Sequence, residues 1–77
     1  MKERVFKILR ELSGKEKITL KDKLENDLGL DSLKMVTLLL EVEEEFGFEL
    51  EESDMNPFEL KTAKDVIKLV EKYEVGK

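Results

Sequence analysis

The sequence contains no cysteine and no histidine among its 77 residues. Without cysteine, the chain has neither a disulfide framework nor a thiolate nucleophile. Without histidine, it lacks the commonest general base and metal ligand of proteins. Catalysis would depend on carboxylates, lysines, hydroxyls or the single tyrosine, in a chain with little bulk to build a dry cleft around them. We therefore predict a protein that is not an enzyme and has no catalytic or metal-binding residues.

Long hydrophobic runs are also absent, because the longest consists of the three residues Leu38 to Leu40. A membrane-spanning helix needs about 20 predominantly apolar residues, and a signal peptide needs an unbroken apolar stretch of about 7 to 15. We therefore expect a soluble, cytoplasmic protein without a membrane span. A chain of this length predicts a single domain over residues 1–77.

Basic residues are missing from one long stretch. Residues 35–60 carry nine acidic and no basic side chains, whereas residues 1–23 carry four acidic and eight basic ones. A local negative field of this kind repels nucleic acid and attracts a basic surface on a partner protein. A second interpretation stays open, in which the acidic residues only form a solvated face that keeps the protein soluble.

Apolar residues recur at helical spacing in three segments, at residues 5–12, 31–46 and 63–73. Side chains three, four and seven positions apart lie on one face of a helix, so each segment predicts an amphipathic helix. The apolar positions are Val5, Ile8, Leu9 and Leu12 in the first segment, Met35, Leu38, Leu39, Val42 and Phe46 in the second, and Val66, Ile67, Val70 and Tyr73 in the third.

Capping residues mark the ends of these segments. Gly47 directly follows the second segment, where a glycine typically ends a helix. Thr62 and Asp65 have the spacing of a capping box at the start of the third segment. No stretch alternates convincingly between apolar and polar residues, and no hairpin dipeptide occurs, so we predict no β-strand.

Two connections complete the predicted fold. Residues 56–60 (Asn-Pro-Phe-Glu-Leu) predict one short helix, because asparagine can cap and proline suits the first helical position. Residues 15–30 form an unusually long connection, whose spaced apolar residues predict an ordered loop packed on the bundle. The expected fold is all-α, a four-helix bundle of three longer helices and one short helix, with a long ordered loop between the first and second helices.

The segment 27–33 (Asp-Leu-Gly-Leu-Asp-Ser-Leu) places a hydroxyl where the loop turns into the longest helix. Asp31 is the predicted N-cap and Ser32 the first helical residue. The backbone N–H groups there have no partner within the helix, and the helix dipole adds positive potential. A phosphate attached to Ser32 would therefore be stabilised. The alternative is a simple cap, since aspartate and serine are enriched at helix starts in general.

Residues 28–33 (Leu-Gly-Leu-Asp-Ser-Leu) and the apolar, acidic helix ending in Glu-Glu-Glu-Phe at 43–46 resemble the acyl carrier protein family of fatty-acid and polyketide synthesis. The likeness extends from about residue 18 to residue 69 and includes the spaced leucines of the loop and the Asn-Pro turn. In this family, the serine of the Asp-Ser-Leu motif bears a phosphopantetheine arm. The resemblance therefore implies that Ser32 is the attachment site and that Asp31 belongs to the motif.

The resemblance also implies a function and a cofactor. A phosphopantetheinyl transferase would transfer 4′-phosphopantetheine from coenzyme A to Ser32, with the help of a magnesium ion. The thiol of the arm would carry acyl intermediates as thioesters in fatty-acid, polyketide or related lipid biosynthesis. Two alternatives stay open: a carrier for an aminoacyl pathway, and an unmodified acidic helical module that binds other proteins.

A second apolar stripe on the longest helix consists of Leu33, Val36 and Leu40. By resemblance, these positions contact acyl-processing synthases and transferases, whose basic docking surfaces pair with nearby carboxylates such as Glu41 and Glu44. The alternative is a helix that is buried on two sides. We expect a monomer that binds no nucleic acid.

One departure from the family concerns the residues after the serine. Many bacterial fatty-acid carriers have acidic residues two and five places after the modified serine, where this chain has Lys34 and Thr37. This difference favours a specialised pathway over housekeeping fatty-acid synthesis.

Overall fold

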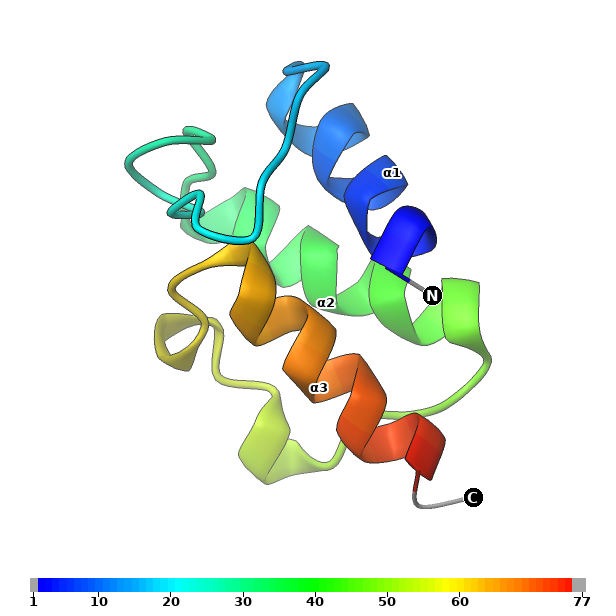
Figure 1. The fold of residues 1–77 in the computed structure, drawn as a ribbon. Helices are drawn as coiled ribbons and strands as arrows, with labels where there is room; N and C mark the ends of the chain where they lie inside the picture. The colour runs from blue at the N-terminus through cyan, green and yellow to red at the C-terminus, as the bar shows by residue number, and fades with distance from the viewer. Residues whose placement is uncertain (1, 76–77) are drawn as a thin grey trace.

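The computed structural model describes residues 2–75, apart from the side chains of residues 57 and 75. In this range it contains three α-helices, α1 (Lys2–Ser13), α2 (Ser32–Phe46) and α3 (Ala63–Val75). Figure 1 shows α2 running across the middle of the molecule, with α1 above it and α3 below. No β-strand is present in the described part, so the all-α class is confirmed. None of these helices is long and apolar enough to cross a membrane.

Side chains from all three helices and from the α1–α2 loop form one hydrophobic core. The apolar faces predicted for the helices are buried there, Leu12 and Tyr73 only partly. Burial of these faces, at about 25 cal/mol per Å² of apolar surface, is the main force that holds the helices together. The core cluster consists of Val5, Ile8 and Leu9 from α1, Leu24, Leu28 and Leu30 from the loop, Met35, Leu38, Val42 and Phe46 from α2, and Ala63, Val66, Ile67 and Val70 from α3.

The ends of α2 and α3 follow from local hydrogen bonds. Gly47 ends α2 in the left-handed conformation (φ 71°), and its N–H donates to Glu43 O at 2.9 Å. At the start of α3, Thr62 N–H donates to Asp65 Oδ2 at 3.1 Å, and Asp65 N–H donates to Thr62 Oγ1 at 3.4 Å. The predicted capping box is therefore present.

The predicted short helix between α2 and α3 is replaced by two 3₁₀ turns, η1 (Glu52–Asp54) and η2 (Pro57–Glu59). η2 lies at the predicted place, and Asn56 Oδ1 accepts a hydrogen bond from Phe58 N–H at 3.0 Å. Three residues do not complete one turn of an α-helix, which has 3.6 residues per turn. The four-helix bundle is therefore not confirmed; residues 2–75 contain three α-helices and these two turns.

Residues 14–31 connect α1 to α2 and are joined to the start of α3 by backbone hydrogen bonds. Leu24 N–H donates to Lys61 O at 2.9 Å, and Ala63 N–H donates to Asp22 O at 3.0 Å. Figure 1 shows this loop at the left of the molecule, above η2. Side-chain burial fixes it further, since Leu24, Leu28 and Leu30 belong to the core and Ile18 and Leu20 pack against it.

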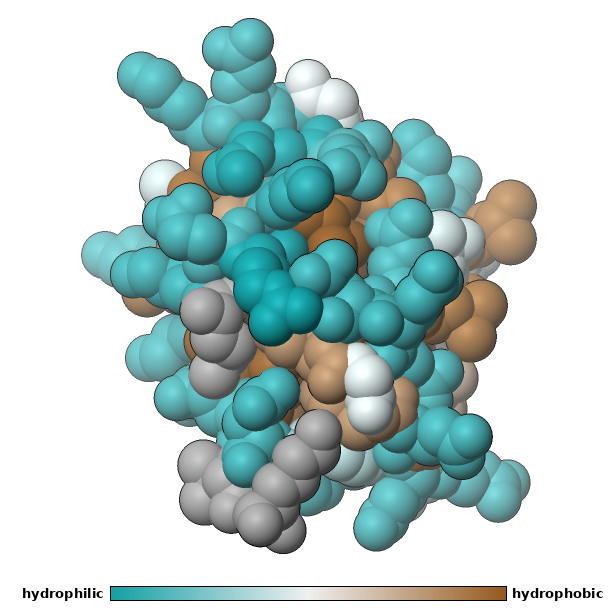
Figure 2. Space-filling model, turned by 90° about the vertical axis from the view of Figure 1, so that its right-hand side faces the viewer, coloured by the Kyte–Doolittle hydropathy of each residue, from teal (hydrophilic) through white to brown (hydrophobic). Residues whose placement is uncertain are grey.

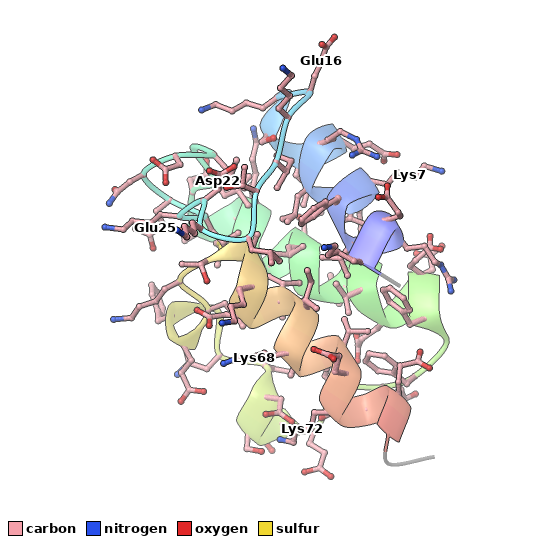
Figure 3. The ribbon with its side chains drawn as sticks, viewed as in Figure 1. Lys7, Glu16, Asp22, Glu25, Lys68 and Lys72 are labelled. Carbon is pink, nitrogen blue, oxygen red and sulfur yellow. The ribbon has the colours of Figure 1, made fainter. Side chains whose placement is uncertain are left out.

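A polar network fixes η1 to the end of α3. The Tyr73 hydroxyl donates to Asp54 Oδ2 at 2.6 Å and accepts from Glu51 N–H at 2.7 Å. Lys72 Nζ lies 3.0 Å from the same Asp54 oxygen, and Figure 3 shows Lys72 beside η1. The hydrogen bond from Tyr73, followed by that from Lys72, holds the pKa of Asp54 below its ordinary value of 3.8.

Candidate phosphopantetheine site at the start of α2

The α1–α2 loop enters α2 through a turn that depends on Gly29. This residue has φ 68°, in the left-handed region that side-chain-bearing residues rarely adopt. Its neighbours Leu28 and Leu30 are only 3% and 2% exposed and anchor the turn in the core. Because these anchors are fixed, Asp31 and Ser32 are held at the surface in a defined position.

Asp31 caps α2, and Ser32 is its first residue. Asp31 Oδ1 accepts a hydrogen bond from Lys34 N–H at 2.9 Å. Ser32 is exposed, and among the described residues no hydrogen bond occupies its hydroxyl. The N–H groups of the first helical turn and the helix dipole add positive potential at this position. A phosphoester on Ser32 would therefore lie in a favourable field and in the open, so the residues present fit a phosphopantetheine group.

The other two serines lack these properties. Ser13 is half-buried at the end of α1, and its hydroxyl accepts a hydrogen bond from Lys15 N–H at 3.1 Å. Ser53 lies in η1 between Glu52 and Asp54, where neighbouring carboxylates would repel a phosphate. Ser32 alone combines an open hydroxyl with a helix start.

The predicted partner-binding stripe on α2 is open to solvent. Leu33, Val36 and Leu40 are 74%, 43% and 53% exposed. With 3.6 residues per turn, they lie opposite the face of α2 that enters the core. Figure 2 shows brown side chains standing out at the right-hand edge of a mostly teal surface. The alternative of a helix buried on two sides does not agree with these exposures.

The two predicted partner-binding carboxylates lie elsewhere on α2, against α1. Glu41 and Glu44 line a surface hollow between the two helices, and Glu41 Oε2 is buried there without a hydrogen-bond partner among the described residues. At its edge, Arg4 Nε lies 2.8 Å from Glu45 Oε2. The structure therefore brings Glu41 and Glu44 together, beside α1. The remaining residues of this hollow are Lys7, Ile8 and Glu11.

One exposed aromatic residue has no place among the predicted site residues. Phe58 in η2 is 71% exposed, and η2 packs against α2. Large apolar side chains at the surface are informative when they lie beside other apolar ones. The signal in the sequence is an aromatic residue inside a polar, proline-led turn, where no helical periodicity accounts for it.

Metal-binding clusters were not expected from the composition. Within residues 2–75, no group of three or more aspartates or glutamates is arranged so that it could hold a metal ion. This part of the chain is a small helical domain that presents a hydroxyl at the start of its longest helix.

Comparison with known proteins identifies the family. Residues 3–70 match the family model described as the phosphopantetheine attachment site. The acyl carrier protein of Coprothermobacter proteolyticus is 46% identical over 56 residues, which cover 73% of this chain and 66% of that protein. The acyl carrier protein of Rickettsia bellii is 28% identical over 76 residues, which cover 96% and 86% of the two chains.

A solved structure from Mycobacterium tuberculosis, assigned as an acyl carrier protein, has the same fold. It matches with a TM-score of 0.82 and 30% sequence identity, over 94% of this chain and 96% of that one. The chain belongs to the acyl carrier protein family. The cofactor of its domain is a covalently attached 4′-phosphopantetheine, and members of this family are carriers and not catalysts.

Proposed function

We propose that this protein carries acyl groups as thioesters on a phosphopantetheine arm attached to Ser32. One observation carries the assignment of the residue: Ser32 is exposed at the first position of α2, directly after the cap residue Asp31. The arm, when bound, supplies the thiol that the chain itself lacks, since the sequence contains no cysteine. Its pathway is fatty-acid, polyketide or related lipid biosynthesis. Lys34 and Thr37, which stand where many bacterial fatty-acid carriers have acidic residues, favour a specialised pathway.

Attachment of the arm requires a phosphopantetheinyl transferase, coenzyme A and magnesium. The Ser32 oxygen forms a bond to the phosphorus that bears pantetheine. The bond from that phosphorus to adenosine 3′,5′-bisphosphate breaks, and the serine proton passes to a base of the transferase. This chain contributes only the positioned nucleophile, which agrees with its lack of histidine.

The proposed docking surface for partner enzymes consists of the exposed stripe on α2 and of two carboxylates in the α1–α2 hollow. Leu33, Val36 and Leu40 would contact apolar residues of a synthase or transferase, while Glu41 and Glu44 attract its basic groups. Support comes from the exposure of the stripe and from Glu41 and Glu44, neither of which forms an ion pair with a described residue. A cytoplasmic location and a monomeric state belong to the same proposal.

Incubation with coenzyme A, magnesium and a broad-specificity transferase tests the attachment. We expect intact-mass spectrometry to show one phosphopantetheine per chain, and no addition to a Ser32→Ala variant. The matched control is Ser53→Ala, which removes another exposed serine and keeps the addition. If no transferase loads the folded wild-type chain, the protein is an unmodified interaction module and the proposal is wrong.

A further inference from the structure

The charged residues of α2 are arranged in the opposite order to those of the other two helices. α1 has Glu3 in its first turn and Arg10 in its last, and α3 has Asp65 in its first turn and Lys72 in its last. A helix dipole favours acids at the start of a helix and bases at its end, so these charges suit α1 and α3. In α2, the first turn contains no acidic residue and the last turn no basic one.

Lys34 is the single charged residue between Ser32 and Leu40. Its side chain is exposed and forms no ion pair with a described residue. The carboxylate of Asp31 stays charged nearby, and its Oδ1 accepts the hydrogen bond from Lys34 N–H. The start of α2 is therefore close to neutral, whereas the end of the helix is acidic, with glutamates at positions 41, 43, 44 and 45.

Two of these glutamates are engaged within the chain. Glu43 Oε2 accepts a hydrogen bond from Leu50 N–H at 2.6 Å, and Glu45 Oε2 lies 2.8 Å from Arg4 Nε. The other two, at positions 41 and 44, line the hollow between α1 and α2 and form no ion pair with a described residue. They are therefore the carboxylates of α2 that remain for a partner.

Lys34 lies where an enzyme that acts on Ser32 must approach. The two residues are two positions apart, which separates their Cα atoms by about 5 Å in a helix. An enzyme that reaches the Ser32 oxygen therefore covers Lys34 as well. Glu41 and Glu44 follow Lys34 by seven and ten positions, so they lie about 10 and 15 Å farther along the helix axis. Figure 1 shows this direction, with α2 running from its start at the left to its end beside the N-terminus of α1.

We propose that the partner enzymes of this protein present a carboxylate to Lys34, beside the entrance that receives the arm, and basic residues to Glu41 and Glu44. Lys34 repels a partner cation at the first place, so it selects against enzymes whose docking surface is basic throughout. Neither the helix dipole nor an ion pair within the described residues accounts for a lysine at this position, which supports a role in recognition. The inference rests on the proposed attachment at Ser32 and goes further by specifying the order of charges on the partner.

Loading rates test this selection. The wild-type chain and Lys34→Glu are loaded from coenzyme A, at low salt, by a broad-specificity transferase with a basic docking surface. We expect the initial rate to be several-fold higher for Lys34→Glu, through a lower KM and an unchanged kcat, because a repulsive contact becomes attractive. Lys64→Glu is the matched control, since it makes the same change of charge at an exposed position in the first turn of α3, and it should leave the rate close to that of the wild type.

A charge swap on the enzyme tests the order of charges directly. The basic residues around the entrance to the active site of the same transferase are replaced one at a time by glutamate. One of these replacements should speed the loading of the wild-type chain and slow the loading of Lys34→Glu. The absence of such a reciprocal pair would overturn the inference.

Two further outcomes would also overturn it and leave the carrier function standing: a Lys34→Glu rate no higher than that of the wild type, or an equal gain from Lys64→Glu. If intact-mass spectrometry shows no loading of any form of the chain, the proposed function fails and this inference with it.

Discussion

At the scale of a single residue, Asp31 caps α2 and so fixes the position at which the Ser32 hydroxyl lies. Its carboxylate satisfies the Lys34 N–H, one of the N–H groups that a helix start leaves without an internal partner. The cap and the hydroxyl proposed to carry the arm are adjacent in sequence, so the stability of the helix start and the geometry of the site depend on the same few atoms.

Replacing Asp31 by alanine removes this cap. We expect the free energy of unfolding to fall by about 0.5–2 kcal/mol, the usual cost of losing a side-chain N-cap. Urea unfolding at neutral pH measures the change. Asp31→Asn is the matched control, because asparagine keeps an oxygen acceptor, and it should cost much less; equal losses in both variants would contradict the capping role.

Leu38 and Leu40 form a second matched pair on α2. Leu38 is fully buried and Leu40 is 53% exposed. Leu38→Ala should destabilise the fold by about 2–5 kcal/mol and leave much of this small domain unfolded, because it creates a cavity in the core. Leu40→Ala should change stability by no more than about 0.5 kcal/mol.

Leu40→Ala should also slow loading by the transferase, since Leu40 belongs to the proposed docking stripe. Unfolding followed by circular dichroism and initial loading rates separate these two effects. A large loss of stability in Leu40→Ala would show that the stripe is structural.

The buried residues of the helices could be predicted from the sequence, because apolar residues recur at helical spacing where one face of a helix packs into the core. Met35, Leu38 and Val42 recur at the spacing of one helix face, and that face is buried. The exposure of Leu33 is different, because periodicity shows that it lies on another face of α2 and does not show whether anything covers that face. Only the positions of α1 and α3 decide this question.

At the scale of secondary-structure elements, the segment between α2 and α3 was the hardest to predict. η1 has three residues, none of them apolar, so no hydrophobic pattern could indicate it. It is held by tertiary contacts of Asp54 with Tyr73, 19 positions later in the sequence. η2 carried a local signal, the capping asparagine and the proline, and its place was predicted correctly although its length was not.

The Asp54 network predicts an acid-sensitive connection between η1 and α3. Because the pKa of Asp54 in the fold is below its ordinary value of 3.8, its contribution to stability is complete above pH 3.8. It is lost as the pH falls from 3.8 through the lower value that the fold imposes. The free energy of unfolding, from urea titrations between pH 7 and pH 2, should therefore decrease over this acidic range.

The Asp54→Asn variant should be less stable than wild type at neutral pH, and this difference should shrink at acidic pH. Glu52→Gln, at an exposed position in the same turn, serves as the control and should leave the acidic loss unchanged. A difference between wild type and Asp54→Asn that stays constant from pH 7 to pH 2 would contradict the network.

On the scale of the whole molecule, charge is distributed unevenly. Nine acidic residues and no basic ones fall between residues 35 and 60, while Lys23 of the α1–α2 loop and Lys61, which precedes α3, line one surface hollow. The sequence showed the acidic stretch, because it is contiguous. It could not show that Lys23 and Lys61 lie together, because backbone hydrogen bonds between distant segments bring them there.

This distribution predicts a salt dependence of partner association. The initial rate of loading by a basic transferase should fall as ionic strength rises, because salt screens the attraction of the acidic surface. Replacing Glu41 and Glu44 together by glutamine should lower the rate at low salt and flatten this dependence. Glu16→Gln, in the loop at the far top of Figure 3, should change neither; equal effects of both replacements would argue against a localised docking surface.

The position of the arm itself tests the account most directly. The chain is produced together with a broad-specificity phosphopantetheinyl transferase, digested, and mapped by tandem mass spectrometry. We predict phosphopantetheine on Ser32 and on no other residue. An arm on Ser13, on Ser53 or on a threonine, or a folded chain that remains unmodified, would contradict the claim that the start of α2 is the carrier site.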